Sequence, residues 1–277
     1  MKLDLESKIE LNNGVEIPVL GLGTLRATGE SVQNAIVCAL EAGYRHIDTA
    51  KAYGNERDVG IGVKRSGLPR DEVFITTKLW NDDHGFDKTL AAIDRSLKNL
   101  KMDFVDLYLI HWPVSGCRIE AWKAMEKILA EGKAHAIGVS NFTIRHIEEL
   151  SAETEIVPAV NQIEFTPYLY QKELQEYCEG KGIKIEAWSP LTSTVKLKDP
   201  KLVTIAAKYG RSPAQILIRW SLQQEAIVIP KSVNKERIFE NAQVFDFKIT
   251  RDDMDRLNEF NEDLRTSGWD PYSDKFK

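Results

Sequence analysis

Short β-rich runs alternate with helical stretches along the whole chain, and this alternation limits the possible folds more than any other feature. Eight β-rich runs follow an opening hairpin, beginning near Val19, Arg45, Val73, Phe104, Ala134, Ala159, Ile183 and Ala226. Helical patterns occupy residues 30–42, 55–66, 88–100, 119–130, 144–150, 171–179, 213–223 and 235–243. Strands that alternate with helices predict a parallel sheet, and eight such units favour a closed barrel over an open sheet.

Further segments extend this pattern. Asn13-Gly14 separates β-rich runs at 9–11 and 15–17 and so predicts a hairpin. Residues 201–208 and 252–260 form two helical patterns outside the eight units. No linker interrupts the 277 residues, and barrels of about 250 residues commonly form one domain. We therefore expect an α/β fold in which residues 1–277 form a single domain, a (β/α)8 TIM barrel with an N-terminal β-hairpin and extra helices.

Composition excludes several classes of protein. The formal net charge is −5, which argues against a nucleic-acid binder with a basic face. No apolar run reaches the roughly 18 residues needed to cross a bilayer, and the first four residues do not open a signal peptide. The three cysteines lie far apart, so neither a disulfide framework nor a metal site is expected. These observations predict a cytoplasmic protein that binds neither membrane nor nucleic acid.

Polar residues follow three consecutive predicted strands at the ends where barrels carry their chemistry. Asp48 ends the second strand, Tyr53 lies five residues later, Lys78 ends the third strand and His111 the fourth. Taken singly, each could be a helix cap, a solvated end or a structural residue. Because the carboxyl ends of barrel strands meet at one mouth, we expect the four side chains to face one another.

This set has a plausible joint chemistry. A tyrosine hydroxyl has a pKa near about 10, so it donates a proton poorly at neutral pH unless a neighbouring cation stabilises the phenolate. Lys78 could supply that cation, Asp48 could hold Lys78 in place, and a neutral His111 could orient a carbonyl oxygen. The set therefore predicts a proton donor for a carbonyl group that accepts a hydride.

A basic cluster follows the eighth strand. Lys231, Lys235 and Arg237 surround Asn234, a plausible helix N-cap. Cations at a helix N-terminus can bind an anion, and barrels commonly bind phosphate after strands seven and eight. A solvated helix start is the alternative. Trp188, at the end of the seventh strand, could stack on a ring or belong to the core.

The ordered motifs of the chain are similar to those of the aldo-keto reductases over essentially its full length. The motifs include Gly21-Leu22-Gly23-Thr24, His46-Ile47-Asp48-Thr49-Ala50, Thr77-Lys78-Leu79-Trp80, Ile137-Gly138-Val139-Ser140-Asn141-Phe142, Ala187-Trp188-Ser189-Pro190-Leu191 and Ile229-Pro230-Lys231-Ser232-Val233. Short loops, between Pro113 and Trp122 and after Phe260, resemble the prokaryotic branch of 2,5-diketogluconate and glyoxal reductases.

The resemblance implies NADPH-dependent reduction of aldehydes and ketones, with small reactive carbonyls or keto-sugars as substrates. It makes Tyr53 the proton donor, Lys78 and Asp48 its tuning pair, and His111 the carbonyl-orienting group. It assigns Ser140, Asn141 and Gln162 to binding the nicotinamide carboxamide and Trp188 to stacking on the nicotinamide ring. The remaining cofactor-binding positions that it implies are Gly23, Thr24, Ser189, Leu191, Ser193, Lys231, Ser232, Val233, Arg237, Glu240 and Asn241.

The substrate pocket is the least determined part. Leu25 stands where many relatives carry a tryptophan, and with the short loops this predicts an open pocket lined by Leu25, Trp80, Trp112 and His111. The expected partner is a small carbonyl compound, and we expect the protein to act as a monomer. Two other functions remain open: a cofactor-binding regulatory subunit of potassium channels, and an aldolase in which Lys78 forms a Schiff base.

Overall fold

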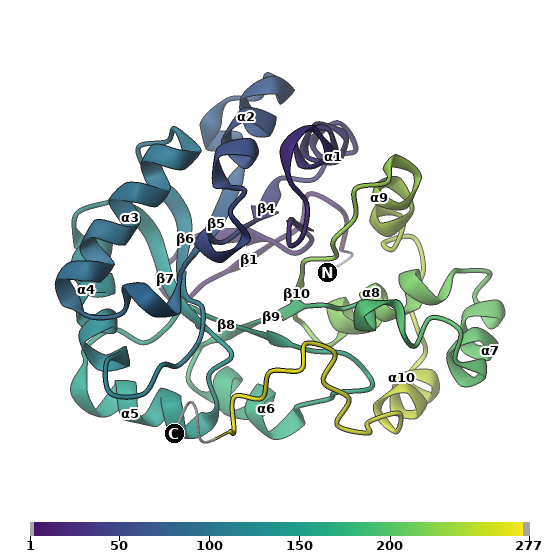
Figure 1. Cartoon of the computed structure of the whole chain (residues 1–277). Helices are drawn as coiled ribbons and strands as arrows, with labels where there is room; N and C mark the ends of the chain where they lie inside the picture. The colour runs from purple at the N-terminus through teal and green to yellow at the C-terminus, as the bar shows by residue number, and fades with distance from the viewer. Residues whose placement is uncertain (1–2, 274–277) are drawn as a thin grey trace.

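Eight parallel strands form one sheet in the computed structural model, which describes residues 3–273 (Figure 1). In chain order they are β3 (Leu22–Gly23), β4 (His46–Asp48), β5 (Phe74–Leu79), β6 (Val105–Ile110), β7 (Ala134–Ser140), β8 (Val160–Glu164), β9 (Lys184–Trp188) and β10 (Ile227–Val228). Each strand pairs with its neighbours in sequence. Strand-to-strand bridges from Leu20 to Val228 and from Gly23 to Lys231 join the two ends of the sheet. The sheet is therefore a closed (β/α)8 barrel, as predicted.

Helices surround the barrel in the predicted order (Figure 1). Those that follow the strands are α1 (Gly29–Glu41), α2 (Glu56–Ser66), α3 (Phe86–Leu100), α4 (Arg118–Ala130), α5 (Ile144–Glu153), α6 (Lys172–Gly180), α8 (Pro213–Gln223) and α9 (Lys235–Ala242). The extra helices are α7 (Pro200–Lys208) and α10 (Arg251–Asn258), and four 3-10 turns are η1 (Lys51–Tyr53), η2 (Arg70–Glu72), η3 (Asn81–Asp83) and η4 (Thr192–Thr194). Among the described residues, no helix is both long and apolar enough to cross a membrane.

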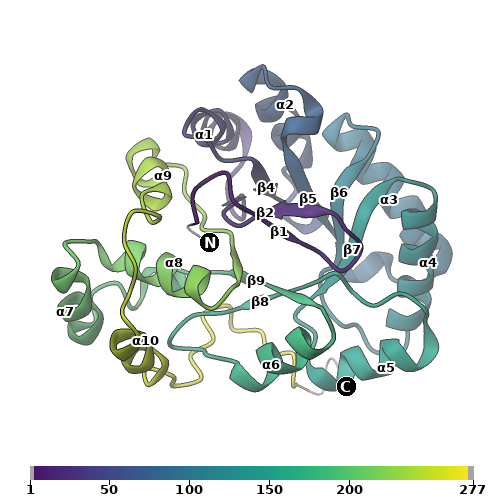
Figure 2. The same cartoon turned by 180° about the vertical axis from the view of Figure 1, so that it is seen from behind.

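The hairpin of β1 (Lys8–Glu10) and β2 (Glu16–Pro18) closes the end of the barrel at which the strands begin. Figure 2 shows it in front of the strands when the molecule is seen from behind. Its side chains Leu11 and Ile17 are buried in an apolar cluster with Leu107 and Leu109 of β6. Apolar side chains therefore fill the amino-terminal end of the barrel.

The barrel interior becomes polar toward the carboxyl ends of the strands. Side chains alternate along a strand, so His46 and Asp48 of β4 share one face. With Lys78, Gln162 and Glu186 from β5, β8 and β9 they form one buried polar cluster. This layer of polar groups supports the site from beneath.

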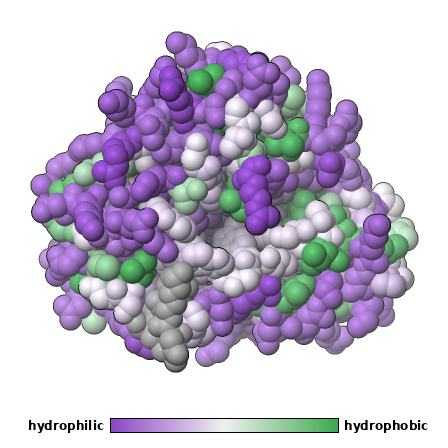
Figure 3. Space-filling view, in the orientation of Figure 1, coloured by the Kyte–Doolittle hydropathy of each residue, from purple (hydrophilic) through white to green (hydrophobic). Residues whose placement is uncertain are grey.

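The segment after α10 crosses the open end of the barrel (Figure 1, yellow). The backbone N–H groups of Glu262 and Leu264 donate to Tyr168 O, and the Thr266 N–H donates to the Glu164 carboxylate at 2.8 Å. Figure 3 shows this face hollowed near its centre, with pale residues in the hollow and hydrophilic ones around it. This segment, the tail, covers part of the mouth of the barrel.

Candidate active site

Lys78 lies at the centre of the proton-transfer set. Its ammonium donates to both carboxylate oxygens of Asp48 at 2.7 Å, to Thr49 O at 2.8 Å and to the Tyr53 hydroxyl at 3.4 Å. The side chain of Lys78 has no exposed surface and that of Asp48 has 3%. The structure therefore brings together three of the four residues predicted from the strand ends, with the ion pair shielded from water.

The loop after β4 sets the position of the tyrosine. Tyr53 ends the 3-10 turn η1, and Gly54 follows with φ 67°, a left-handed conformation that suits glycine. The buried Asn55 accepts from the Thr49 hydroxyl at 2.7 Å and donates to Thr24 O at 2.9 Å. Asn55 thus holds the loop against the end of β3, and the hydroxyl of Tyr53 is directed at Lys78.

The pKa of Tyr53 differs from the sequence-based expectation that Lys78 stabilises the phenolate, whereas the charged state of Lys78 agrees with it. Burial raises the pKa of Tyr53 above its ordinary value of 10, and Lys78 only partly opposes that effect. Burial disfavours the Lys78 ammonium, but its partners, the Asp48 carboxylate above all, outweigh that effect and raise the pKa of Lys78. The tyrosine is therefore held protonated, ready to donate, beside a lysine that stays charged.

His111 lies beside the tyrosine as a neutral ring. Its ring centroid is 5.7 Å from that of Tyr53 and 5.2 Å from that of Trp80, both in edge-to-face contact. Burial, and then Lys78, lower the pKa of His111 well below 6.5. Its Nδ1 is buried without a hydrogen-bond partner among residues 3–273. A neutral imidazole suits a group that orients a carbonyl oxygen.

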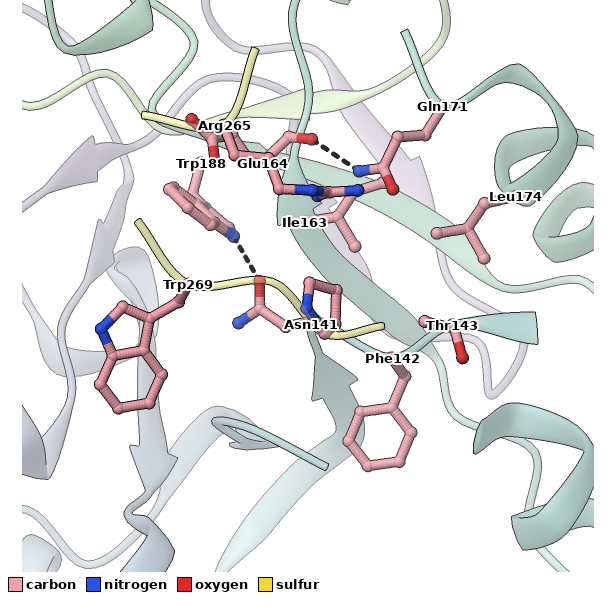
Figure 4. A pocket seen from close by; sticks show the side chains of 11 residues that line it. Asn141, Phe142, Thr143, Ile163, Glu164, Gln171, Leu174, Trp188, Arg265 and Trp269 are labelled. Atoms are coloured by element: carbon pink, nitrogen blue, oxygen red, sulfur yellow. Dashed lines mark hydrogen bonds between the residues drawn. The ribbon is translucent and has the colours of Figure 1, made fainter. Parts of the chain in front are cut away.

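The carboxyl-terminal parts of β7, β8 and β9, with the residue that follows β7, bring further polar side chains to the same mouth. Asn141 Nδ2 donates to His111 O at 3.0 Å, and Trp188 Nε1 donates to Asn141 Oδ1 at 3.0 Å (Figure 4). Ser140 Oγ donates to Gln162 O at 2.8 Å. Trp188 is half-buried, which leaves part of its ring open to a ligand.

The basic residues lie on the other side of the mouth, where β3 meets β10. Gly23 pairs with Lys231, and a Cβ on Gly23 would lie 2.9 Å from Ile229 O, so glycine is required for this close approach. Burial and the neighbouring charges of Arg237 and Arg26 lower the pKa of Lys231. Arg26 therefore lies near Lys231, as Arg237 does, and this third cation was not predicted from the sequence.

Other predicted cofactor positions lie around this edge. Asn234 caps α9 by accepting from Arg237 N at 2.9 Å, and Ser232 donates to Asn234 O at 3.3 Å. Thr24 Oγ1 donates to Asp48 O at 2.9 Å. Val233 is exposed, Glu240 and Leu191 are half-buried and Asn241 is buried.

Ser189 and Ser193 belong to a strained segment after β9. Both have positive φ, 51° and 48°, as do Thr192 and Thr194. Residues other than glycine rarely adopt this conformation. The two serine hydroxyls lie 3.1 Å apart, and each contacts the Thr266 hydroxyl of the tail. Surrounding contacts therefore hold the segment in an unusual shape, a common feature of ligand-binding loops.

The segment after α10 brings a further aromatic side chain to residues that are predicted to line the substrate pocket. Trp269, from the tail, packs against Trp112 and Trp80 with ring centroids 5.0 and 6.3 Å apart. Leu25, another predicted lining residue, is 45% exposed. The tail therefore places Trp269 beside Trp80 and Trp112, so the three tryptophan rings form one aromatic cluster.

Glu186 and Trp269 were not predicted from the sequence as residues of the site. Glu186 could have been found, because residues 184, 186 and 188 share one face of a strand that ends at Trp188. Trp269 could not, since its segment has no periodic pattern and its position depends on the path of the tail.

The arrangement of these residues fits nicotinamide adenine dinucleotide phosphate as the cofactor. Half-buried Trp188 offers a flat face, the side chains of Asn141 and Gln162 offer amides, and Lys231 and Arg237 lie at a helix N-terminus suited to a phosphate. No group of three or more His, Cys, Asp or Glu within residues 3–273 is placed to hold a metal ion.

Comparisons with known proteins agree with this geometry. The model of the Aldo/keto reductase family matches residues 19–262. The chain is 48% identical to glyoxal reductase of Bacillus subtilis (strain 168), over 96% of each chain. It is 50% identical to 9,11-endoperoxide prostaglandin H2 reductase of Trypanosoma cruzi (strain CL Brener), over 94% of this chain and 93% of that protein. Among solved structures, a Bombyx mori aldo-keto reductase in complex with NADP is 37% identical, with a TM-score of 0.90 over 98% of this chain and 99% of that one.

Proposed function

The chain belongs to the aldo/keto reductase family and is an NADP-dependent oxidoreductase that reduces carbonyl groups; from that premise we propose how its own residues act. The observation that carries the proposal is the partly buried contact of Tyr53 with Lys78, which is itself held by Asp48. No other hydroxyl in the described chain has this lysine as its donor.

Tyr53 donates the proton. A carbonyl oxygen at the mouth accepts one hydrogen bond from the Tyr53 hydroxyl and another from the neutral His111 ring. As negative charge develops on that oxygen, the proton moves from Tyr53, and the Lys78 ammonium stabilises the phenolate that remains. Asp48 keeps Lys78 charged and in place. In alcohol oxidation the same tyrosine accepts the proton.

The other face of the mouth binds the cofactor, which supplies the hydride when bound. Ser140, Asn141 and Gln162 would hold its carboxamide, and Trp188 would stack on its ring. Lys231, Ser232 and Arg237 would bind the 2′-phosphate. The remaining positions in this proposal are Gly23, Thr24, Ser189, Leu191, Ser193, Val233, Glu240 and Asn241.

Small aldehydes, ketones and dicarbonyls such as glyoxal are the proposed substrates. The relatives named above include a glyoxal reductase, and the pocket side made by Trp80, Trp112 and Trp269 offers flat apolar contacts. Leu25 would contact only the larger substrates, from the rim. We also propose that residues 1–277 form a single domain, of which 1–2 and 274–277 lie outside the described residues, and that the protein is a cytoplasmic monomer.

A panel of glyoxals, aromatic aldehydes and keto-sugars, assayed by the loss of NADPH absorbance, tests the function. Consumption of NADPH with formation of the matching alcohol is expected. An aldolase acting through Lys78 would instead trap substrate on that lysine under borohydride and consume no NADPH. That result, or the absence of turnover on every member of the panel, would contradict the proposal.

A further inference from the structure

Glu186 is a buried carboxyl in the barrel interior that the proton-transfer set does not use. It lies on β9 in register with Gln162 of β8, and it has no exposed surface. The Gln162 amide nitrogen donates to Glu186 Oε2 and to Asp48 Oδ2, both at 2.8 Å. A primary amide nitrogen has two hydrogens, so these two bonds use both.

These bonds fix the orientation of the Gln162 amide. If the amide flipped, its oxygen would face the Asp48 carboxylate, and both N–H hydrogen bonds, to Asp48 and to Glu186, would be lost. No hydrogen bond within residues 3–273 reaches Gln162 Oε1. The oxygen is therefore the group that Gln162 can offer to a ligand, and it can only accept a hydrogen bond.

Glu186 performs this role as a neutral acid. Burial, and then the nearby Asp48, raise the pKa of Glu186 to about 8. Lys78 is the cation of this cluster and is already paired with Asp48, while burial lowers the pKa of His46 to about 3 and keeps it uncharged. The second oxygen of Glu186 lies 3.6 Å from His46 Nε2. A neutral Glu186 accepts from Gln162 without competing with Asp48 for the lysine.

We propose that Glu186 is a positioning residue for the nicotinamide: it holds the Gln162 amide so that its oxygen accepts the carboxamide N–H. The inference rests on the proposed function, which assigns Gln162 to the carboxamide. If residue 186 offered no acceptor, the Gln162 amide could rotate and present N–H groups to the N–H groups of the ligand.

Two variants and two ligands test this role. Glu186→Leu removes the acceptor, whereas Glu186→Gln keeps a neutral carbonyl oxygen at the same place. NADP⁺ carries the carboxamide, whereas its 3-acetylpyridine analogue has a methyl ketone there and no N–H. With dissociation constants measured at pH 7 by tryptophan fluorescence quenching, Glu186→Leu should weaken NADP⁺ binding about three- to tenfold and the analogue by less than about twofold. Glu186→Gln should restore the wild-type ratio of the two constants.

Glu56→Leu is the matched control. It also removes a buried carboxyl, one that accepts from Thr77 and Asn99 outside the cluster, and it should leave the ratio of the two constants unchanged. If Glu186→Leu does not fold, Glu186→Met carries the same prediction. Equal weakening of both ligands, or of neither, would overturn the inference. Wild-type protein that bound neither ligand would instead reject the proposed function.

Discussion

The side chain of Lys78 has no exposed surface, which disfavours its charge, yet its pKa is raised, chiefly by the Asp48 carboxylate, and the ammonium stays charged. His111 is also buried, and burial and then the charge of Lys78 lower its pKa, because no carboxylate opposes them. Similar burial therefore produces a charged lysine and a neutral histidine. The partner of each side chain, more than its depth, decides which form it takes.

Glu186 gives a prediction for the pH dependence of stability. Its pKa rises from an ordinary 4.5 to about 8, so between these values the folded protein holds a proton that the unfolded chain has released. Wild-type stability should therefore fall, through this residue, as pH rises across that window. Glu186→Gln has no such proton, so its unfolding free energy relative to wild type should increase with pH, by up to about 1.4 kcal/mol per pH unit.

Urea unfolding of both proteins at several values between pH 5 and pH 8, the window set by the two pKa values, measures this difference. A difference that stays constant over the range would show that Glu186 does not change its protonation on folding. Tyr108→Phe, which alters another buried polar side chain, should give a difference independent of pH in that range.

At the scale of elements, helix packing depends on a glycine of α2. A Cβ on Gly60 would lie 2.1 Å from Leu100 O, at the end of α3, and neither backbone can move without disturbing its helix. Gly60→Ala should therefore lower the unfolding free energy by about 1–3 kcal/mol. Gly180→Ala, in α6 with nothing within 4 Å of the new Cβ, should leave it unchanged or raise it. Equal stabilities of the two variants by thermal unfolding would contradict this packing.

The start of α9 gives a prediction for the choice of cofactor. Lys231 lies with Arg237 and Arg26 where a 2′-phosphate would bind. Charge-assisted hydrogen bonds to a phosphate are worth about 1.5–3 kcal/mol, so Lys231→Glu should raise the dissociation constant of NADPH about ten- to a hundredfold. The constant for NADH, which has no 2′-phosphate, should change far less.

Lys235→Glu is the control for this variant, since it reverses a charge four residues further along, at the first residue of α9. Its effect on NADPH should be much smaller than that of Lys231→Glu. Fluorescence titration with both cofactors decides the matter. Equal weakening of NADPH and NADH by Lys231→Glu would separate this lysine from the phosphate.

Most elements could be predicted because their signals are local. Ser212 and Gln215 form a capping box at the start of α8, with Pro213 in its first turn. At the other end of a helix, Gly67 follows the last residue of α2 and has the positive φ that is typical of a helix C-cap. The tail could not be predicted, because Thr266 is held by Glu164 from a strand 102 residues earlier. Only the folded barrel provides that partner.

At the scale of the whole molecule, the barrel brings distant residues to one mouth. Asp48, Lys78, His111, Gln162 and Lys231 come from five different strands or the residues that follow them, and the order of these strands in the sheet follows the sequence. That regularity is why the site could be predicted in outline from strand ends alone. The interior beneath it, where Gln162 reaches across to Asp48, depends on barrel closure and was not predicted.

The central claim is that Tyr53 gives the proton during carbonyl reduction. The most direct measurement is the single-turnover rate of NADPH oxidation by Tyr53→Phe with saturating aldehyde, beside its dissociation constant for NADPH. The account predicts a rate about 10²–10⁴ lower than that of the wild type, the usual contribution of general acid catalysis, with the dissociation constant unchanged. A wild-type rate in Tyr53→Phe, with hydride transfer shown to limit it, would contradict the account.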